Sequence, residues 1–298
     1  MKVVLPFSTD HLSAVPSGFD VVVADAVDDW PDNARDAEFY VPSYRFSAAV
    51  IEVISSLPHL RVVQTLTAGV DHIVPVIPPG VTLCNAAGVH DAATSELAVG
   101  LMIAAQRRLP DLVRAQDQQV WDQQMSSSLA DQHVLVVGAG HIGHAVQRRL
   151  SGFECEVTLV GRTARPGVRA SHELPILLPQ ADIVLVIVPI TDETAGMVDR
   201  AFLARMRDGA LLVNVSRGAV VVTDDLIAEL RSGRLRAALD VTDPEPLPAG
   251  HPLWSAPGVI ITPHVGGASS AMWPRAYRLV GEQLRRLSAG EPLLNQVN

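Results

Sequence analysis

The sequence predicts an α/β protein built from parallel sheets with helices on both faces. Short runs of Val, Leu and Ile alternate along the chain with stretches in which apolar residues recur at helical spacing. Apolar runs of this kind are typical of strands buried on both faces, as in parallel sheets covered by helices. A glycine-rich segment directly after one of these runs, Gly138 to Gly143, is the third observation that favours this fold class.

The first part of the chain predicts three buried strands and a helix between the last two of them. A second, longer helix is expected from Ala92 to about Arg108, because Thr94-Ser95-Glu96 is a helix-start pattern and Pro110 follows its expected end. The polar segment 115–131 is expected to be an exposed crossing segment or an arm. The three strands are expected at 3–5, 21–23 and 62–65, and the first helix at 44–57.

From His133 on, the alternation of strands and helices becomes clearer. Six apolar runs follow one another, most of them separated by helical segments, and six strands in one doubly wound unit match the Rossmann architecture. A last helix, at about 274–287, is expected to pack back on the first domain. The six runs are 134–137, 157–160, 183–188, 211–215, 237–240 and 259–262.

Composition and charge restrict the class of protein. The 298 residues are enough for two domains, and 48% of them are apolar. The net charge of -9 argues against nucleic-acid binding, which usually shows a basic patch. No apolar run reaches the ~18 residues of a membrane span, and the start of the chain lacks a signal-peptide pattern. Cys84 and Cys155 predict buried free thiols, so we expect a cytoplasmic protein with no metal site.

The segment Gly138 to Gly143 fits the G-x-G-x-x-G pattern, directly after a predicted strand and at the start of a predicted helix. The first glycine permits a tight turn, the second lets the backbone approach a pyrophosphate, and the third lets helix and strand pack closely. The pyrophosphate would meet the free N–H groups at the positive end of the helix. We therefore expect a dinucleotide cofactor to contact Gly138, Gly140, His141, Ile142 and Gly143.

The tip of the next predicted strand indicates which dinucleotide is bound. NAD sites usually place an Asp or Glu there, about 20 residues on, where it binds the ribose 2′-hydroxyl. Here the strand ends in Gly161-Arg162-Thr163-Ala164-Arg165, without a carboxylate. Arg162 and Arg165 would pair with a 2′-phosphate, with the Thr163 hydroxyl beside them, unless they are only solvated loop residues. NADP is therefore favoured over NAD.

Three segments just past predicted strands carry candidate catalytic residues: 214–218, 239–246 and 262–267. Ligands of open parallel sheets bind outside the carboxyl ends of the strands. An imidazole such as His264 suits proton transfer near neutrality. Glu245 can hold that imidazole in one tautomer and stabilise its charged form, and the Arg217 fork can hold a carboxylate and polarise a carbonyl. Each residue also has a structural alternative without a catalytic role. His264 could be a structural histidine at a strand end, Glu245 a turn carboxylate, and Arg217 a surface residue at a helix start.

The ordered series of these motifs resembles the D-2-hydroxyacid dehydrogenase family over almost the whole chain. Thr67-Ala68-Gly69-Val70-Asp71 is similar to the substrate-carboxylate loop of the family, and the segment 189–194 is similar to its P-x-T-x-x-T segment. The resemblance implies reduction of a small 2-oxo acid, for instance glyoxylate or hydroxypyruvate, or oxidation of the matching D-2-hydroxy acid. It also implies Arg217, Glu245 and His264 as the catalytic set.

The same resemblance implies the domain organisation and further contacts. A Rossmann-type dinucleotide domain, 98–272, would be inserted in a smaller flavodoxin-like α/β substrate domain formed by 1–97 and 273–298. The N–H groups of Ala68 and Gly69 would complete the carboxylate site, and a homodimer would use 105–130 as its arm. Asp240 would accept a hydrogen bond from the nicotinamide carboxamide. Further cofactor contacts are expected at Thr94, Pro189, Thr194, Ser216 and Gly266.

The chain departs from the family pattern in two places. Arg162 replaces the acidic residue common in NAD-using members, and 129–132 stands where many members have Leu-x-Gly-Lys. Phosphoglycerate and phosphite dehydrogenases share the fold and remain alternatives, while formate dehydrogenase is disfavoured because the resemblance implies Gln where Glu245 stands. A dinucleotide-sensing scaffold is the alternative from another class, although the sequence shows no added interaction tail.

Overall fold

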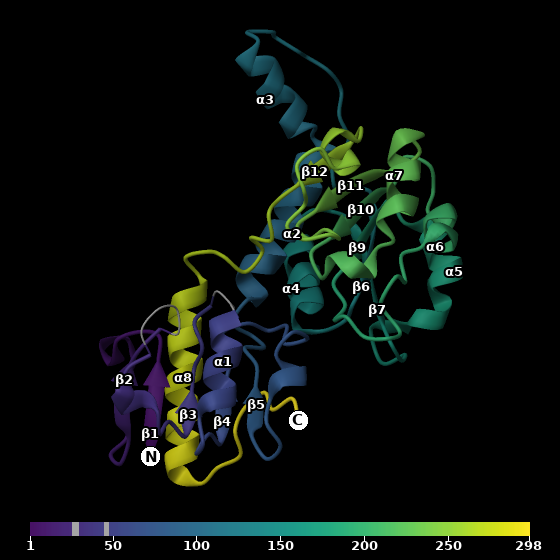
Figure 1. The fold of residues 1–298 in the computed structure, drawn as a ribbon. Helices are drawn as coiled ribbons and strands as arrows, with labels where there is room; N and C mark the ends of the chain where they lie inside the picture. The colour runs from purple at the N-terminus through teal and green to yellow at the C-terminus, as the bar shows by residue number, and fades with distance from the viewer. Residues whose placement is uncertain (26–29, 45–47) are drawn as a thin grey trace. The chain divides into compact units, whose positions relative to one another are not determined.

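The computed structural model describes residues 1–25, 30–44 and 48–298. The chain forms two compact units, of which one comprises Met1–His90 with Ser270–Asn298 and the other Asp91–Ser269. The first unit thus ends at residue 90 rather than at the expected 97, and resumes at 270 rather than 273. Each unit holds its own parallel sheet (Figure 1), so the expected α/β fold with a Rossmann-type unit and a second, smaller α/β unit is confirmed.

The first unit is built on a five-stranded parallel sheet with the order β2-β1-β3-β4-β5. This is the flavodoxin-type order. Its strands are β1 (Lys2–Leu5), β2 (Asp20–Val23), β3 (Phe39–Tyr40), β4 (Val62–Gln64) and β5 (Thr82–Cys84), its α-helices are α1 (Ala48–Ser56) and α8 (Met272–Ala289), and its 3₁₀ helices are η1 (Thr9–His11), η2 (Asp32–Ala34) and η3 (Val74–Val76).

The two helices supply the apolar cover of this sheet. Met272, Ala276, Val280 and Leu284 recur at helical spacing along α8 and share one apolar cluster with residues of β1 and β4. Val50, Val53 and Ile54 of α1 belong to a second cluster with residues of the same strands. The last helix therefore packs on the first unit, as expected. Of the helix expected at 44–57, residues 45–47 lie outside the described residues.

The second unit contains a seven-stranded parallel sheet with the order β12-β11-β10-β9-β6-β7-β8. All six expected strands are present, and β8 is an addition that the sequence did not predict. The order reverses between β6 and β9, so the topological switch point of a Rossmann sheet lies at their carboxyl ends. The strands are β6 (His133–Val137), β7 (Glu156–Gly161), β8 (Val168–Ala170), β9 (Ile183–Val186), β10 (Leu211–Asn214), β11 (Arg236–Leu239) and β12 (Val259–Ile261).

Helices cover both faces of this sheet (Figure 1). Residues of α2 and α4 pack in the apolar cluster on one face, and residues of α5, α6 and α7 pack in the cluster on the other. The α-helices are α2 (Asp91–Gln106), α3 (Leu109–Asp117), α4 (His141–Leu150), α5 (Leu174–Leu177), α6 (Arg200–Arg205) and α7 (Thr223–Arg231), and the 3₁₀ helices are η4 (Ser171–Glu173), η5 (Leu178–Gln180), η6 (Gly218–Val220) and η7 (Pro252–Ser255).

The polar segment expected at 115–131 comprises the end of α3 and the residues that follow this helix. Pro110 lies in the first turn of α3, where the missing N–H breaks no helical hydrogen bond. Beyond α3 the chain exposes large apolar side chains, with Trp121 at 92% and Met125 at 96% of their full accessible surface. No helix among the described residues is long and apolar enough to cross a membrane.

Candidate dinucleotide and catalytic site

The three glycines of the turn between β6 and α4 differ in what surrounds them. Gly138 has a φ of +126°, and a Cβ atom there would lie 2.4 Å from the carbonyl oxygen of Ile187. A Cβ at Gly143 would lie 2.0 Å from the carbonyl oxygen of Gly138, whereas a Cβ at Gly140 would meet nothing within 4 Å. Close packing therefore requires the first and third glycines, while the second borders open space that a ligand can occupy.

The N-terminus of α4 is available to an anion. Gly140 is the N-cap residue, and no described side chain caps the helix. The first-turn N–H groups, including those of His141 and Ile142, therefore lack the capping that many helices have. The His141 ring is 75% exposed, with Nδ1 3.5 Å from a carboxylate oxygen of Asp91. Open space at Gly140 and an uncapped helix end together fit the phosphates of a dinucleotide.

Arg162 and Arg165, at the tip of β7, have different surroundings. Nη2 of Arg165 donates a 2.6 Å hydrogen bond to the carbonyl of Ala139, so this side chain braces the glycine turn. The guanidinium of Arg162 is exposed and has no hydrogen-bond or ion-pair partner among the described residues, and Thr163 beside it is also exposed. Of the two arginines, Arg162 is therefore the one whose whole guanidinium remains free to bind a ligand.

The Pro189 to Thr194 segment after β9 is closed by one hydroxyl. Oγ1 of Thr194 donates to the carbonyl of Pro189 over 2.6 Å and accepts from the N–H of Thr191 over 2.8 Å. The two expected cofactor contacts in this segment thus stabilise each other.

Asn214, at the end of β10, organises the turn that carries Arg217. Its Oδ1 accepts from the N–H and the hydroxyl of Ser216, and its Nδ2 donates 2.9 Å to the carbonyl of Arg217. Nη1 of the half-buried Arg217 donates to the carbonyl of Ser216 over 2.8 Å. The sequence analysis missed this positioning residue, for which the only signal was an asparagine within an apolar run; the structure shows that it is fully buried.

Gly218, next to Arg217, is in close contact with the loop that follows β11. A Cβ at this position would lie 1.9 Å from the carbonyl oxygen of Thr242. The loop continues to Glu245, so the turn that carries Arg217 and the loop that carries Glu245 are packed backbone to backbone. No other residue type fits at position 218 without a shift of one of them.

His264 and Glu245 form a hydrogen-bonded pair. Nδ1 of His264 lies 2.5 Å from Oε1 of Glu245, and the two side chains are 45% and 40% exposed. Because the carboxylate accepts from Nδ1, it selects the tautomer and orientation of the ring. The other ring nitrogen, Nε2, is then the one that can exchange a proton with a ligand.

Asp240, at the end of β11, holds the loop that carries His264. Its carboxylate is only 2% exposed and accepts from the N–H groups of Val265 and Gly266 over 2.9 and 2.8 Å. The hydroxyl of Thr262 donates to the same carboxylate over 2.6 Å. These bonds fix a loop in which His264 has a φ of +52°, an unusual conformation for a side-chain-bearing residue. The structure thus gives Asp240 a positioning task that was not foreseen beside its expected nicotinamide contact.

Gly266 packs against both Asp240 and a second predicted cofactor residue. A Cβ there would lie 2.9 Å from Oδ2 of Asp240 and 3.4 Å from Cγ2 of Thr94. Thr94 is 7% exposed, on α2. Within the second unit the structure therefore brings Thr94, Asp240 and Gly266 together.

The two residues of the expected substrate-carboxylate loop, Ala68 and Gly69, belong to the first unit. Neither of their N–H groups donates a hydrogen bond within the described chain, whereas both carbonyls accept one. The N–H groups are thus available to an anion.

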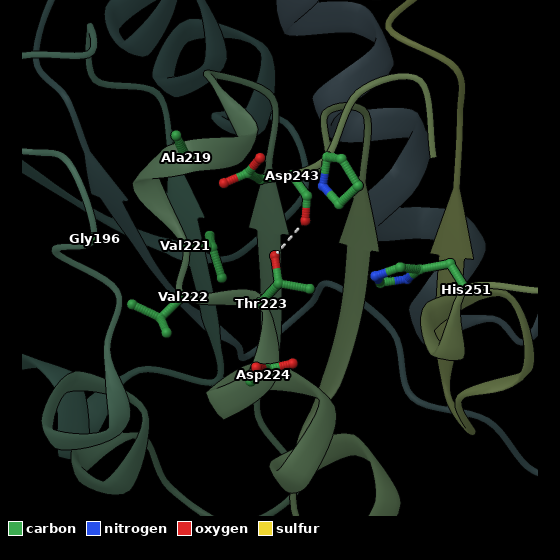
Figure 2. Close-up of a pocket in the computed structure, with 9 residues that line it drawn as sticks. Gly196, Ala219, Val221, Val222, Thr223, Asp224, Asp243 and His251 are labelled. Atoms are coloured by element: carbon green, nitrogen blue, oxygen red, sulfur yellow. Dashed lines mark hydrogen bonds between the residues drawn. The ribbon is translucent and has the colours of Figure 1, made fainter. Parts of the chain in front are cut away.

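A separate cavity of about 440 Å³ lies at the first turn of α7 (Figure 2). The hydroxyl of Thr223 donates 2.8 Å to the carbonyl of Asp243 at its wall. Its carboxylates are poor partners for an anionic ligand, and it contains none of the residues that the sequence predicts for the site. The lining residues are Gly196, Ala219, Val221, Val222, Thr223, Asp224, Asp243, Pro244 and His251.

Comparison with known proteins identifies a family and similar proteins for this chain. The family model described as D-isomer specific 2-hydroxyacid dehydrogenase, NAD binding domain, matches residues 99–266. A glyoxylate reductase/hydroxypyruvate reductase from Mus musculus is 37% identical over 225 residues, which are 71% of this chain and 69% of that protein.

Two solved structures resemble both units of the chain. A D-isomer specific 2-hydroxyacid dehydrogenase from Xanthobacter autotrophicus Py2, in complex with NADPH, has a TM-score of 0.83 at 30% identity and covers 100% of this chain and 97% of its own. An NADPH-dependent glyoxylate/hydroxypyruvate reductase from Sinorhizobium meliloti, in complex with NADP and malonate, has a TM-score of 0.80 at 26% identity, with 99% and 96% covered.

Proposed function

Because the chain belongs to the D-isomer specific 2-hydroxyacid dehydrogenase family, we propose that it reduces a small 2-oxo acid of the glyoxylate or hydroxypyruvate type with NADPH. The observation that carries the proposal is the His264–Glu245 pair, with Nδ1 and Oε1 2.5 Å apart, on loops at the same edge of the sheet as Arg217. A proton donor and a guanidinium at the carboxyl ends of parallel strands are what reduction of a carbonyl beside a carboxylate requires.

Each residue of the site has a different role in the proposed reaction. When bound, the nicotinamide would supply a hydride to the carbonyl carbon. His264, protonated at Nε2, delivers its proton to the carbonyl oxygen as negative charge develops there, and Glu245 stabilises the imidazolium that starts the reaction. Arg217 holds the carboxylate of the substrate and polarises its carbonyl. The N–H groups of Ala68 and Gly69 complete the carboxylate site.

NADPH is the proposed cofactor because the free guanidinium at the tip of β7 suits a 2′-phosphate. Arg162 is exposed without a partner among the described residues, and no carboxylate stands between it and Arg165. A carboxylate at this position would instead bind the ribose hydroxyls of NAD and repel the phosphate. The phosphates of the cofactor would lie at the N-terminus of α4.

A homodimer is the proposed assembly, with the segment 105–130 as the contact between copies. Trp121 and Met125 are almost fully exposed there, and large exposed apolar side chains grouped on one segment usually mark an interface. Light scattering on the purified protein tests this, because a monomer at micromolar concentration would contradict the assignment.

The activity is tested by a screen of purified protein with NADPH and NADH against glyoxylate, hydroxypyruvate, pyruvate and 3-phosphohydroxypyruvate, followed at 340 nm. The proposal predicts turnover of glyoxylate or hydroxypyruvate with a higher kcat/KM for NADPH. Preferred turnover of the phosphorylated acid would replace the substrate assignment, and no turnover of any 2-oxo acid would contradict the proposed function.

A further inference from the structure

The loop that holds Ala68 and Gly69 is fastened through its carbonyl groups. Because a peptide unit is planar, the carbonyl of one residue and the N–H of the next have opposite directions and are fixed together. Anchoring the Ala68 carbonyl therefore orients the N–H of Gly69, and anchoring the Thr67 carbonyl orients that of Ala68. The anchoring donors are His90 Nε2 to Leu66 (2.7 Å), Ala86 N–H to Thr67 (2.9 Å), Asn85 Nδ2 to Ala68 (3.0 Å) and the Thr67 hydroxyl to Gly69 (2.9 Å).

Asn85, which anchors the Ala68 carbonyl, is itself held by the C-terminal tail. The N–H of Asn85 donates 3.0 Å to the carbonyl of Asn295, and Nδ2 of Asn295 donates to the carbonyls of Asn85 and Ala87 over 3.4 and 3.0 Å. Oδ1 of Asn85 accepts from the N–H of Ala87 over 3.0 Å, which leaves Nδ2 directed at Ala68. Asn295 has a φ of +54°, a conformation that asparagine tolerates better than most residues.

A pair of fully buried amides fixes the position of the tail. Gln283 on α8 exchanges two 2.9 Å hydrogen bonds with the backbone of Leu294, and its Nε2 also donates 2.6 Å to Oε1 of Gln64. Nε2 of Gln64 in turn donates to the carbonyls of Thr65 and Asn85 over 2.8 and 3.0 Å. The last helix, the tail and the strand that leads into the Ala68 loop thus share one buried hydrogen-bond network.

We propose that Asn85 and Asn295 are positioning residues for the carboxylate of the substrate, so that the C-terminal tail is part of the substrate site. Through the Asn295–Asn85–Ala68 series of hydrogen bonds, the tail fixes the direction of the N–H of Gly69. The inference rests on the proposed function, because it takes the Ala68–Gly69 loop as the carboxylate site. Neither asparagine touches the substrate.

The test compares Asn85→Ala and Asn295→Gly with Asn298→Ala as a matched control. Asn298 lies in the same tail and also makes two side-chain hydrogen bonds, to Leu83 N–H (2.8 Å) and the Val81 carbonyl (2.9 Å), but neither of them is to Asn85. Glycine at position 295 keeps the left-handed backbone accessible while it removes the side chain. The measurements are KM and kcat for glyoxylate, oxalate affinity by calorimetry, NADPH affinity by fluorescence, and Tm.

Loss of one or two hydrogen bonds should weaken carboxylate binding by about 3- to 10-fold. We expect Asn85→Ala and Asn295→Gly to raise KM for glyoxylate and Kd for oxalate together by this factor, while NADPH affinity stays within twofold. Asn298→Ala should lower Tm at most, without this change in KM or oxalate affinity.

Unchanged oxalate affinity in Asn85→Ala would overturn the inference, as would an equal loss in Asn298→Ala, which would mark a general effect of loosening the tail. Oxalate binding needs no turnover, so the two failures are distinguishable. A wild-type protein that binds oxalate but reduces no 2-oxo acid contradicts the proposed function, and one that does not bind oxalate contradicts the assignment of the loop.

Discussion

The two units present free backbone N–H groups by different means. In the second unit they come from the uncapped N-terminus of α4, and the turn that exposes them lies within Gly138 to Gly143. In the first unit they come from an irregular loop, in which the peptide plane after Ala68 is held by the side chain of Asn85, and Asn85 is in turn held by Asn295. A helix end is oriented by its own hydrogen bonds, whereas the loop depends on contacts that span the chain. The two sites should therefore respond differently to substitution.

The largest expected effect is a loss of turnover that leaves ligand binding by both units intact. His264→Ala removes the proton donor, and general acid catalysis typically contributes about 10²- to 10⁴-fold, so kcat should fall by this factor. NADPH and oxalate affinities should change little, because the glycine turn and the Ala68 loop are intact. Steady-state kinetics and the two binding assays check this, and near-normal turnover would remove His264 from the mechanism.

The next effect contrasts two glycines of the same turn. A methyl group at Gly143 would lie 2.0 Å from a backbone oxygen, so Gly143→Ala should lower the free energy of unfolding by about 1–3 kcal/mol or more. Gly140→Ala has open space in the free protein, so it should keep its stability but bind NADPH at least about tenfold more weakly. Urea unfolding and fluorescence titration measure the two quantities. Equal NADPH affinity in Gly140→Ala would mean that the cofactor does not approach this residue.

A third comparison concerns the two arginines beside the same turn. Arg162→Asp replaces an attraction by a repulsion, so kcat/KM with NADPH should fall by roughly one to two decades while that with NADH is retained. Arg165→Ala removes the bond to the Ala139 carbonyl and should weaken both cofactors alike. Kinetics with each cofactor distinguish the cases. A wild-type preference for NADH, or the same response in both variants, would refute the assignment of Arg162.

The smallest expected effect is a difference in alkylation rate between the two cysteines, of which each unit contains one. Burial raises the pKa of the Cys84 thiol to about 11, and it raises the pKa of the half-buried Cys155 as well. Iodoacetamide at pH 8 should therefore alkylate Cys155 slowly and leave Cys84 untouched until the first unit unfolds. An unfolded thiol titrates near 8.5, so the contribution of Cys84 to stability is complete below that pH and is lost as the pH rises towards 11. Peptide mass analysis would expose an error if Cys84 reacted first.

The same contrast explains which features could be predicted from the sequence. Three glycines within six residues, directly after a run of buried Val and Leu, are a local pattern with one physical explanation. The apolar runs that form most strands of the second unit are local patterns too. β3 is only two residues long and β8 depends on a tight turn between Arg165 and Val168, so neither produces a recognisable run.

Other features depend on tertiary contacts that no local pattern records. Arg165 is identical in kind to Arg162, and only the position of the Ala139 carbonyl shows that it braces the turn. The roles of Asp240 and Asn214 follow from the loops that fold back onto them, and Asn85 meets Asn295 because β5 lies beside the tail.

The proposed function requires a hydride to pass from the nicotinamide of the bound cofactor to the carbonyl carbon of a 2-oxo acid. The most direct measurement supplies NADPH deuterated at either face of C4 and determines by mass spectrometry and NMR where the label appears after glyoxylate is reduced. We expect one of the two labelled cofactors to yield glycolate with one deuterium on C2, and the other to yield unlabelled glycolate. Unlabelled glycolate from both, or no glycolate at all, would contradict it.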